Sequence, residues 1–206
     1  MNQTRAKTKK DVVTEFRTSA ILSAAHRVFA EKGFHEATID EVAKAAKVAK
    51  GTVYLYYRSK HDLYWAALEV GIRDMLSKTK TNMDQARTTG DKIHAFIETK
   101  IRYFDENREF FKIYYSEFGN VLTHPAESRK DFTRLYRSQA RMLQEALERG
   151  LRRKEVRCNR AESAALAIAE LTRGLIIHRL LGWSKAKVED DIRFLFEFVQ
   201  KGIGRS

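Results

Sequence analysis

Side chains that can bind an anionic partner are concentrated in residues 48–63, VAKGTVYLYYRSKHDL. On a short helix, Lys50 and Tyr54 lie four residues apart, as do Thr52 and Tyr56, so these four project from the side away from the core. Hydroxyl groups and an ammonium group presented together can bind DNA phosphates and the edges of bases. The chemistry predicted for this segment is noncovalent recognition of nucleic acid.

The same segment also carries residues that would hold such a helix in place. Val53 and Tyr57 lie four residues apart and are expected to face inward, behind Val48. Gly51 has no side chain, so the backbone can approach another surface closely at this point. Lys60 begins the next helix and is expected to add a phosphate contact.

No arrangement in the sequence indicates covalent catalysis or a metal site. None of the 6 histidines has HxxxH or HExxH spacing. The adjacent acids at 105–106 and 190–191 point to different faces of a helix, so they are poorly placed to act together. Cys158 is the only cysteine, which excludes an internal disulfide and disfavours a cysteine-based zinc site. We therefore expect a protein that is not an enzyme and that needs neither cofactor nor metal.

A helix–turn–helix is predicted to position the anion-binding segment. Apolar spacing from about Thr14 indicates a helix that ends at Gly33. Thr38 and Glu41 then form a capping box that starts a second helix. Its pattern stops near Lys47 and restarts within about three residues, which is helix–turn–helix spacing.

The rest of the chain continues the helical pattern without a convincing strand or repeat. The sequence predicts an all-α protein of about nine helices. The expected boundaries are a flexible basic arm at 1–13, a helix–turn–helix domain at 14–58 and a helical domain at 59–206.

Composition favours a polyanionic partner. The formal net charge is +12, and residues 1–60 hold 12 of the 39 Lys/Arg but 6 of the 27 Asp/Glu. Such a charge suits nucleic acid or a membrane surface, and its concentration near the predicted helix–turn–helix favours DNA. The N-terminus lacks the apolar core of a signal peptide and no run reaches the length of a membrane span, so a cytoplasmic location without a membrane partner is expected.

Residues 38–63, TIDEVAKAAKVAKGTVYLYYRSKHDL, resemble the DNA-binding segment of the TetR family of bacterial transcription regulators. The resemblance covers about residues 14–68. It implies that Lys50, Gly51 and Thr52 meet bases or nearby phosphates, and that Thr38, Tyr54, Tyr56 and Lys60 mostly hold the DNA backbone. Two departures stand out: Ala49 replaces a frequent Ser or Thr cap, and Tyr56 replaces a frequent His.

The family resemblance also implies a three-helix N-terminal domain and a larger C-terminal helical domain for ligand binding and dimerisation. It further implies a homodimer that leaves its DNA operator when a small ligand binds the C-terminal domain. Polar groups within apolar stripes, together with nearby aromatic residues, are the candidates for a ligand cavity, and they suit a hydrophobic effector with an acid group, such as an acyl compound. These candidates are His94, Arg102, Tyr103, Tyr114, Tyr115, Phe118, Arg173 and His178.

Two C-terminal helices are more apolar than one neighbouring helix requires, which favours subunit contact over a thick monomer core. Their predicted interface residues are Ile168, Leu171, Leu175, Phe194, Leu195 and Phe198. The function predicted from the sequence is a ligand-responsive, sequence-specific repressor. A basic protein that coats DNA without sequence preference is one alternative, and a helical enzyme is the other.

Overall fold

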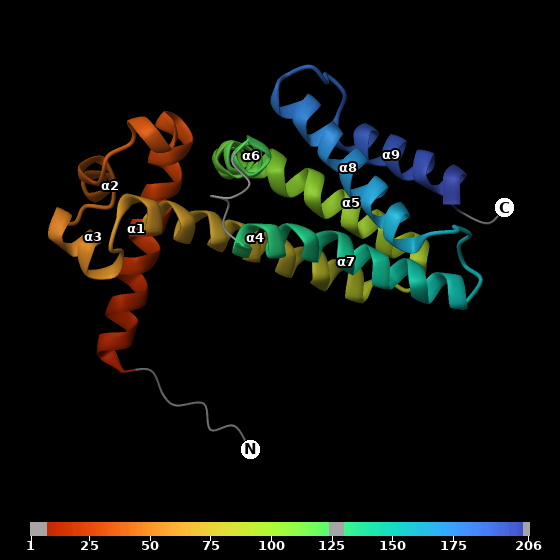
Figure 1. The fold of residues 1–206 in the computed structure, drawn as a ribbon, viewed down its shortest axis with the longest axis horizontal. Coiled ribbons are helices and arrows are strands. Elements are labelled where there is room, and N and C mark those ends of the chain that lie inside the picture. Colours follow the sequence, from red (N-terminus) through yellow and green to blue (C-terminus); the bar gives the residue numbers. More distant parts are fainter. Residues whose placement is uncertain (1–7, 124–129, 204–206) are drawn as a thin grey trace. The chain divides into compact units, whose positions relative to one another are not determined.

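A computed structural model describes residues 8–123 and 130–203, which form nine α-helices and no strand (Figure 1). The predicted all-α class is confirmed for these residues. None of the described helices is both long enough and apolar enough to cross a membrane. In chain order the helices are α1 (Lys9–Glu36), α2 (Ile39–Ala45), α3 (Lys50–Tyr56), α4 (Lys60–Gln85), α5 (Thr89–Glu106), α6 (Arg108–Thr123), α7 (Lys130–Arg152), α8 (Ala161–Leu180) and α9 (Val188–Ile203).

The chain forms two compact units. Unit 1 comprises the residues up to Gly71 together with Glu109–Phe118, and unit 2 comprises Ile72–Arg108 and the residues from Gly119 onward. The division differs from the expected boundary at 58/59, because the first turns of α4 bury Leu63, Ala67 and Leu68. Helices α4 and α6 therefore each contribute residues to both units.

Helix α1 supplies much of the core of unit 1. Ile21, Ala25, Val28 and Phe29 are buried at the three- and four-residue spacing read from the sequence. The helix begins at Lys9 instead of near Thr14, so part of the expected arm at 1–13 is helical, while residues 1–7 lie outside the described structure.

Gly33 interrupts α1 where the sequence predicted the helix to end. Its φ is 75°, in the left-handed region that a residue without Cβ adopts at little cost, and helical turns resume as far as Glu36. The direction of the chain into α2 is thus set at Gly33.

The segment of α6 in unit 1 is held by aromatic packing. The Phe110 ring is buried and stacks on His26 of α1, with ring centroids 6.0 Å apart. The Tyr64 hydroxyl of α4 donates a hydrogen bond to the Ile113 carbonyl oxygen at 3.3 Å. Residues of α1, α4 and α6 therefore share one core.

Replacing Gly71 with alanine should destabilise this core. A Cβ at Gly71 would overlap the ring of Phe110, which is buried and cannot swing into solvent. Overpacking of this kind costs about 1–3 kcal/mol of unfolding free energy. Urea unfolding of the purified variant measures the loss. Gly51→Ala is the control, because a Cβ there meets no atom within 4 Å, and equal stability of the two variants would contradict the packing argument.

Unit 2 is built around α5, which packs against α7, α8 and α9. Ile93, Phe96, Ile97 and Phe104 line its buried faces. A capping box between Thr88 and Asp91 begins the helix. Figure 1 shows α7, α8 and α9 grouped around α5.

Candidate functional site

The start of α2 is fixed by the capping box predicted from the sequence. The Thr38 hydroxyl oxygen accepts a hydrogen bond from the Glu41 backbone N–H at 3.3 Å, and a Glu41 carboxylate oxygen accepts one from the Thr38 N–H at 3.0 Å. Lys32 of α1 forms an ion pair with Glu41 and, with the Thr38 bonds, holds the pKa of Glu41 below its usual value. These contacts tie the start of α2 to the end of α1.

The turn between α2 and α3 is tight. The Val48 N–H donates to the Ala43 carbonyl oxygen at 3.0 Å, and Lys47 has a φ of 57°. Left-handed backbone is uncommon for a residue with a Cβ, so this turn holds Lys47 in an unfavourable conformation. Val48, expected to be tucked inside the turn, is only half-buried.

Helix α3 has one buried side and one exposed side. Val53 is fully buried, whereas Lys50, Gly51 and Tyr54 are exposed. Thr52 and Tyr56 are half-buried at the flanks of this exposed side. The sequence reasoning therefore placed the predicted recognition residues on the correct side of the helix.

The most exposed apolar residue of α3 was missed. Leu55 is 81% exposed, and it lies four residues from Gly51 on the outermost line of the helix. The available signal was its position two residues after Val53, which on a helix points away from the core. Ala49 stands at the N-cap without a side-chain hydrogen bond, as its departure from the family pattern predicted.

Lys50 has an acidic partner within unit 1. Its ammonium donates to the Asp40 carboxylate at 2.7 Å, and this contact raises the pKa of Lys50. Both side chains are exposed, and water screens such a pair, so it is easily exchanged for another anion. The pair holds the Lys50 ammonium beside the exposed side of α3.

Lys60 is placed differently from the prediction. Its ammonium donates to the carbonyl oxygens of His35 at 3.0 Å and Ala37 at 2.9 Å, and lies 4.7 Å from the centroid of the Phe34 ring. These bonds occupy two of its three N–H donors. Lys60 thus binds the end of α1 and the residue that follows it, a contact that the sequence reasoning, which expected Lys60 to add a phosphate contact, did not foresee.

Replacing Lys60 with methionine should therefore destabilise the protein. Two carbonyl oxygens lose a charged donor, and each such bond contributes about 1–3 kcal/mol. Urea unfolding should show a lower midpoint for Lys60→Met and no change for Lys50→Met, whose ammonium forms only an exposed ion pair. Equal stability of wild type and Lys60→Met would show that the carbonyl contacts contribute nothing.

The predicted ligand-binding residues are divided between the two units. Tyr114 and Tyr115 lie in the α6 segment of unit 1, whereas the candidates at 94, 102, 103, 173 and 178 lie in unit 2. Phe118 is in α6, but its side chain lies outside the described structure. Apolar spacing predicted the buried sides of the helices correctly but carried no information on which neighbour each side meets.

Within unit 2, the polar candidates contact residues of their own helix or of another helix. Arg102 donates to Glu98 at 3.0 Å and to Glu189 of α9 at 3.1 Å. Tyr103 is buried beneath the ammonium of Lys78, and burial raises the pKa of its hydroxyl. Arg173 pairs with Glu170 one turn away.

His94 and His178 are also packed against neighbours. The His94 ring meets Phe196 of α9 edge to face, with centroids 4.9 Å apart, and lies 3.5 Å from the Glu98 carboxylate. The His178 ring meets Trp183 edge to face at 5.2 Å. Neither contact by itself indicates a ligand site.

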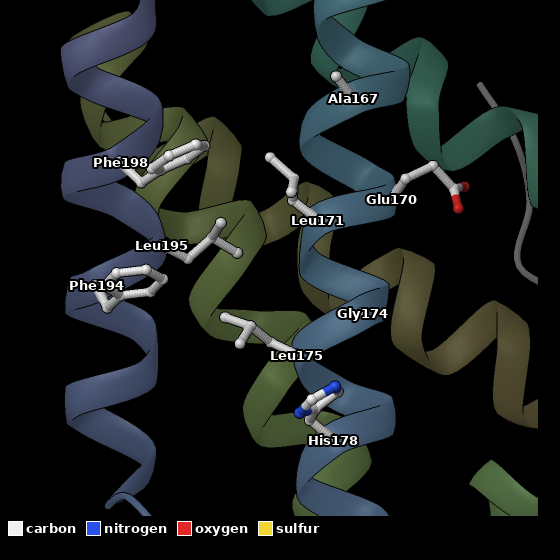
Figure 2. Close-up of a pocket in the computed structure, with 9 residues that line it drawn as sticks. All are labelled: Ala167, Glu170, Leu171, Gly174, Leu175, His178, Phe194, Leu195 and Phe198. Atoms are coloured by element: carbon white, nitrogen blue, oxygen red, sulfur yellow. The ribbon is translucent and has the colours of Figure 1, made fainter. Parts of the chain in front are cut away.

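An apolar groove of about 730 Å³ lies between α8 and α9. Figure 2 shows Leu171 and Leu175 of α8 projecting toward α9, and Leu195 and Phe198 of α9 projecting toward α8. Glu170 points away from the groove. The full lining is Ala167, Glu170, Leu171, Gly174, Leu175, His178, Phe194, Leu195 and Phe198.

The predicted interface residues differ in how far they are exposed. Leu171, Phe194 and Phe198 are 42%, 61% and 57% exposed. Ile168 and Leu195 are buried within the chain; Leu195 contributes to the floor of the groove, whereas Ile168 is not part of it. Ile168 therefore belongs to the core of its own chain, because a wide apolar helix face must cover that core before it can meet a second subunit.

Two described parts of the chain match known families. Residues 21–67 match the bacterial regulatory proteins of the tetR family, and residues 86–176 match the tetracyclin repressor-like C-terminal domain. The HTH-type transcriptional regulator YdeS of Bacillus subtilis is 32% identical over 166 residues, which are 79% of this chain and 77% of YdeS. The chain spans about half the length of the first curated relatives it matches, between 40% and 54%.

Solved structures share the fold. The regulator FadR from Bacillus subtilis in complex with stearoyl-CoA aligns with a TM-score of 0.73 and 18% identity, covering 88% of this chain and 96% of FadR. A transcriptional regulator from Saccharomonospora viridis in complex with choline aligns with a TM-score of 0.82 and 19% identity, covering 94% of this chain and all (100%) of that regulator. From its capped helix–turn–helix, its helical C-terminal unit and these matches, the chain belongs to the TetR family of bacterial transcriptional regulators.

Proposed function

We propose that this protein is a homodimeric, sequence-specific DNA-binding regulator that leaves its operator when a small hydrophobic molecule binds unit 2. The observation that carries the proposal is α3, a short helix with Val53 buried beneath it and with exposed donors and bare backbone on its other side. A second helix of this type enters the major groove of DNA.

The contacts follow from the chemistry of each side chain. Lys50 and Thr52 suit base edges and nearby phosphates, and Gly51 lets the backbone come close. Thr38, Tyr54 and Tyr56 suit the sugar-phosphate backbone. Leu55 adds an apolar contact that suits the methyl group of thymine.

The α8–α9 groove is the proposed dimer interface. Its lining is almost wholly apolar, and its exposed phenylalanines lie on a wide surface that water solvates poorly. Gly174 and Ala167 allow a second copy to approach closely. A two-fold pair of subunits would present two α3 helices to the two halves of an operator.

The effector is proposed to be an apolar or amphipathic molecule. The helical unit 2 resembles in fold a regulator solved with stearoyl-CoA, which favours an acyl compound. Helices α4 and α6 each contribute residues to both units. A shift of either helix on ligand binding would therefore also move its residues in unit 1, the unit that contains α3. Coupling between two such sites typically amounts to about 1–3 kcal/mol.

Fluorescence anisotropy with the DNA upstream of the protein's own gene and with random DNA, at two salt concentrations, tests the proposal. Specific contacts should give tighter binding to the upstream fragment at both salt concentrations, because base contacts persist when phosphate contacts are screened. Equal binding to upstream and random DNA, lost together as salt rises, would point to the alternative of a nonspecific DNA-coating protein. Sequences selected from a random pool then replace the upstream fragment, and their failure to bind preferentially would reject specific recognition.

A further inference from the structure

Unit 2 contains a buried cation that has no place in the DNA-binding function. Lys100 lies on α5 among the apolar residues of the core and is 6% exposed. Its ammonium donates to the Gln139 side-chain oxygen of α7 at 2.6 Å and lies 5.0 Å from the centroid of the Phe96 ring. Gln139 is itself buried. Neither partner carries a negative charge.

The nearest acid is committed elsewhere. Glu170 of α8 influences Lys100 through space, but its carboxylate accepts hydrogen bonds from the Tyr136 hydroxyl and from Arg173. Within the described residues, no carboxylate lies within ion-pair distance of the Lys100 ammonium. In the cluster where α5, α7 and α8 meet, the described residues thus leave Lys100 without a counter-ion.

A buried ammonium without a counter-ion is unfavourable, because burial removes its hydration. That burial lowers the pKa of Lys100 to about 8, with Glu170 raising it and Arg173 lowering it by smaller amounts. The group is still mostly protonated at pH 7. The hydrogen bond to the neutral Gln139 amide and the contact with the face of the Phe96 ring compensate only in part for the lost hydration. If position 100 served packing alone, methionine or leucine there would make the fold at least as stable as lysine does.

We infer that Lys100 and Gln139 form the head-group site for an effector with a carboxylate and an apolar body. The carboxylate would supply the anion that the cluster lacks, and Phe96 and the neighbouring core residues would contact the apolar body. The inference rests on the proposed ligand response of unit 2 and specifies its chemical class. Sequence reasoning assigned the acid-binding role to Arg102 or Arg173, but both already have carboxylate partners.

Two substitutions test the site in opposite ways. Lys100→Met removes the charge with little change in volume. Gln139→Glu leaves Lys100 in place and provides an internal carboxylate. Both should weaken dodecanoate binding on the order of 10- to 100-fold, measured by titration calorimetry below the micellar concentration, because charged hydrogen bonds contribute in this range. Lys80→Met, on the exposed surface of α4, is the control and should bind as wild type does.

Binding of dodecanol, which has no carboxylate, separates the contribution of the charge to affinity from that of the apolar chain. Wild type should bind dodecanoate more tightly than dodecanol, and the two variants should bind both equally. A carboxylate beside Lys100 also raises its proton affinity, so dodecanoate binding at pH 8 should take up protons in wild type but not in Lys100→Met. Calorimetry in buffers of different ionisation enthalpy measures this uptake.

Stability separates ligand binding from a structural role. Lys100→Met should unfold at the same or a higher urea concentration than wild type, because it removes a buried charge. Dodecanoate binding unchanged in both variants, equal wild-type affinity for dodecanol, or no dodecanoate binding at all would overturn the inference. DNA binding without dodecanoate is measured on the same samples, so a failure of the proposed DNA-binding function is seen separately.

Discussion

Replacing Gly51 with leucine should abolish specific operator binding while leaving the protein folded. A Cβ at this position meets no atom within 4 Å, so the new side chain extends into solvent without disturbing unit 1. Leucine also favours a helix over glycine by about 1 kcal/mol. On DNA the same side chain would stand between the α3 backbone and the base edges. The loss of close approach removes one or more base contacts, and operator affinity should fall on the order of 100-fold.

Anisotropy and thermal unfolding together measure this effect. The unfolding temperature should be unchanged or higher, whereas binding to the operator should approach that to random DNA. Gly202→Leu is the matched control, because it also adds a side chain where nothing lies within 4 Å but is located at the end of α9. Operator binding retained by Gly51→Leu would mean that α3 does not approach DNA through this side.

Placing aspartate at Phe198 should convert the protein to monomers. Phe198 is 57% exposed and lines the α8–α9 groove, so in a two-fold dimer it would be buried and repeated by its symmetry mate. Burial of two unpaired carboxylates at one interface is strongly unfavourable. Light scattering should then give about 23.9 kDa, where the proposed wild-type dimer should give about twice that mass.

Operator affinity should fall with the dimer, by on the order of 1,000-fold, because a monomer loses the advantage of two linked contacts. Phe16→Asp is the control for the mass measurement, since Phe16 is also an exposed phenylalanine but lies on α1 in unit 1. A wild-type protein that is monomeric at all concentrations would reject the interface. A dimer that survives Phe198→Asp would place the interface elsewhere.

Local sequence rules were sufficient for the helix–turn–helix. The capping box at Thr38 and the burial of Val53 depend on residues three or four positions apart, and such spacing is visible in the chain itself. Lys60 shows the limit of these local rules. Its acceptors lie 23 and 25 residues away, so a motif that reads as a phosphate contact could not reveal that the ammonium binds carbonyl oxygens of the same chain.

Sequence reasoning about the ligand-binding candidates met a related limit. Polar residues in apolar stripes were chosen for their position on one helix, but whether each is paired depends on the helices packed against it. Arg102 finds Glu189 on α9, which is 87 residues distant in sequence. Lys100 was not among the candidates, because only the packing of α7 and α8 on α5 makes it a buried lysine.

The packing of residues 109–118 within unit 1 has a consequence for exchanging DNA-binding units between regulators. A graft cut after residue 71 would leave His26 without Phe110 and Tyr64 without the Ile113 carbonyl, and a graft cut after residue 58 would lack Tyr64 as well. The recipient's own α6 would have to fill that space by chance. A stable chimera must therefore include two separate segments of the sequence. Recombination at a single point between two such genes would seldom produce a stable DNA-binding unit.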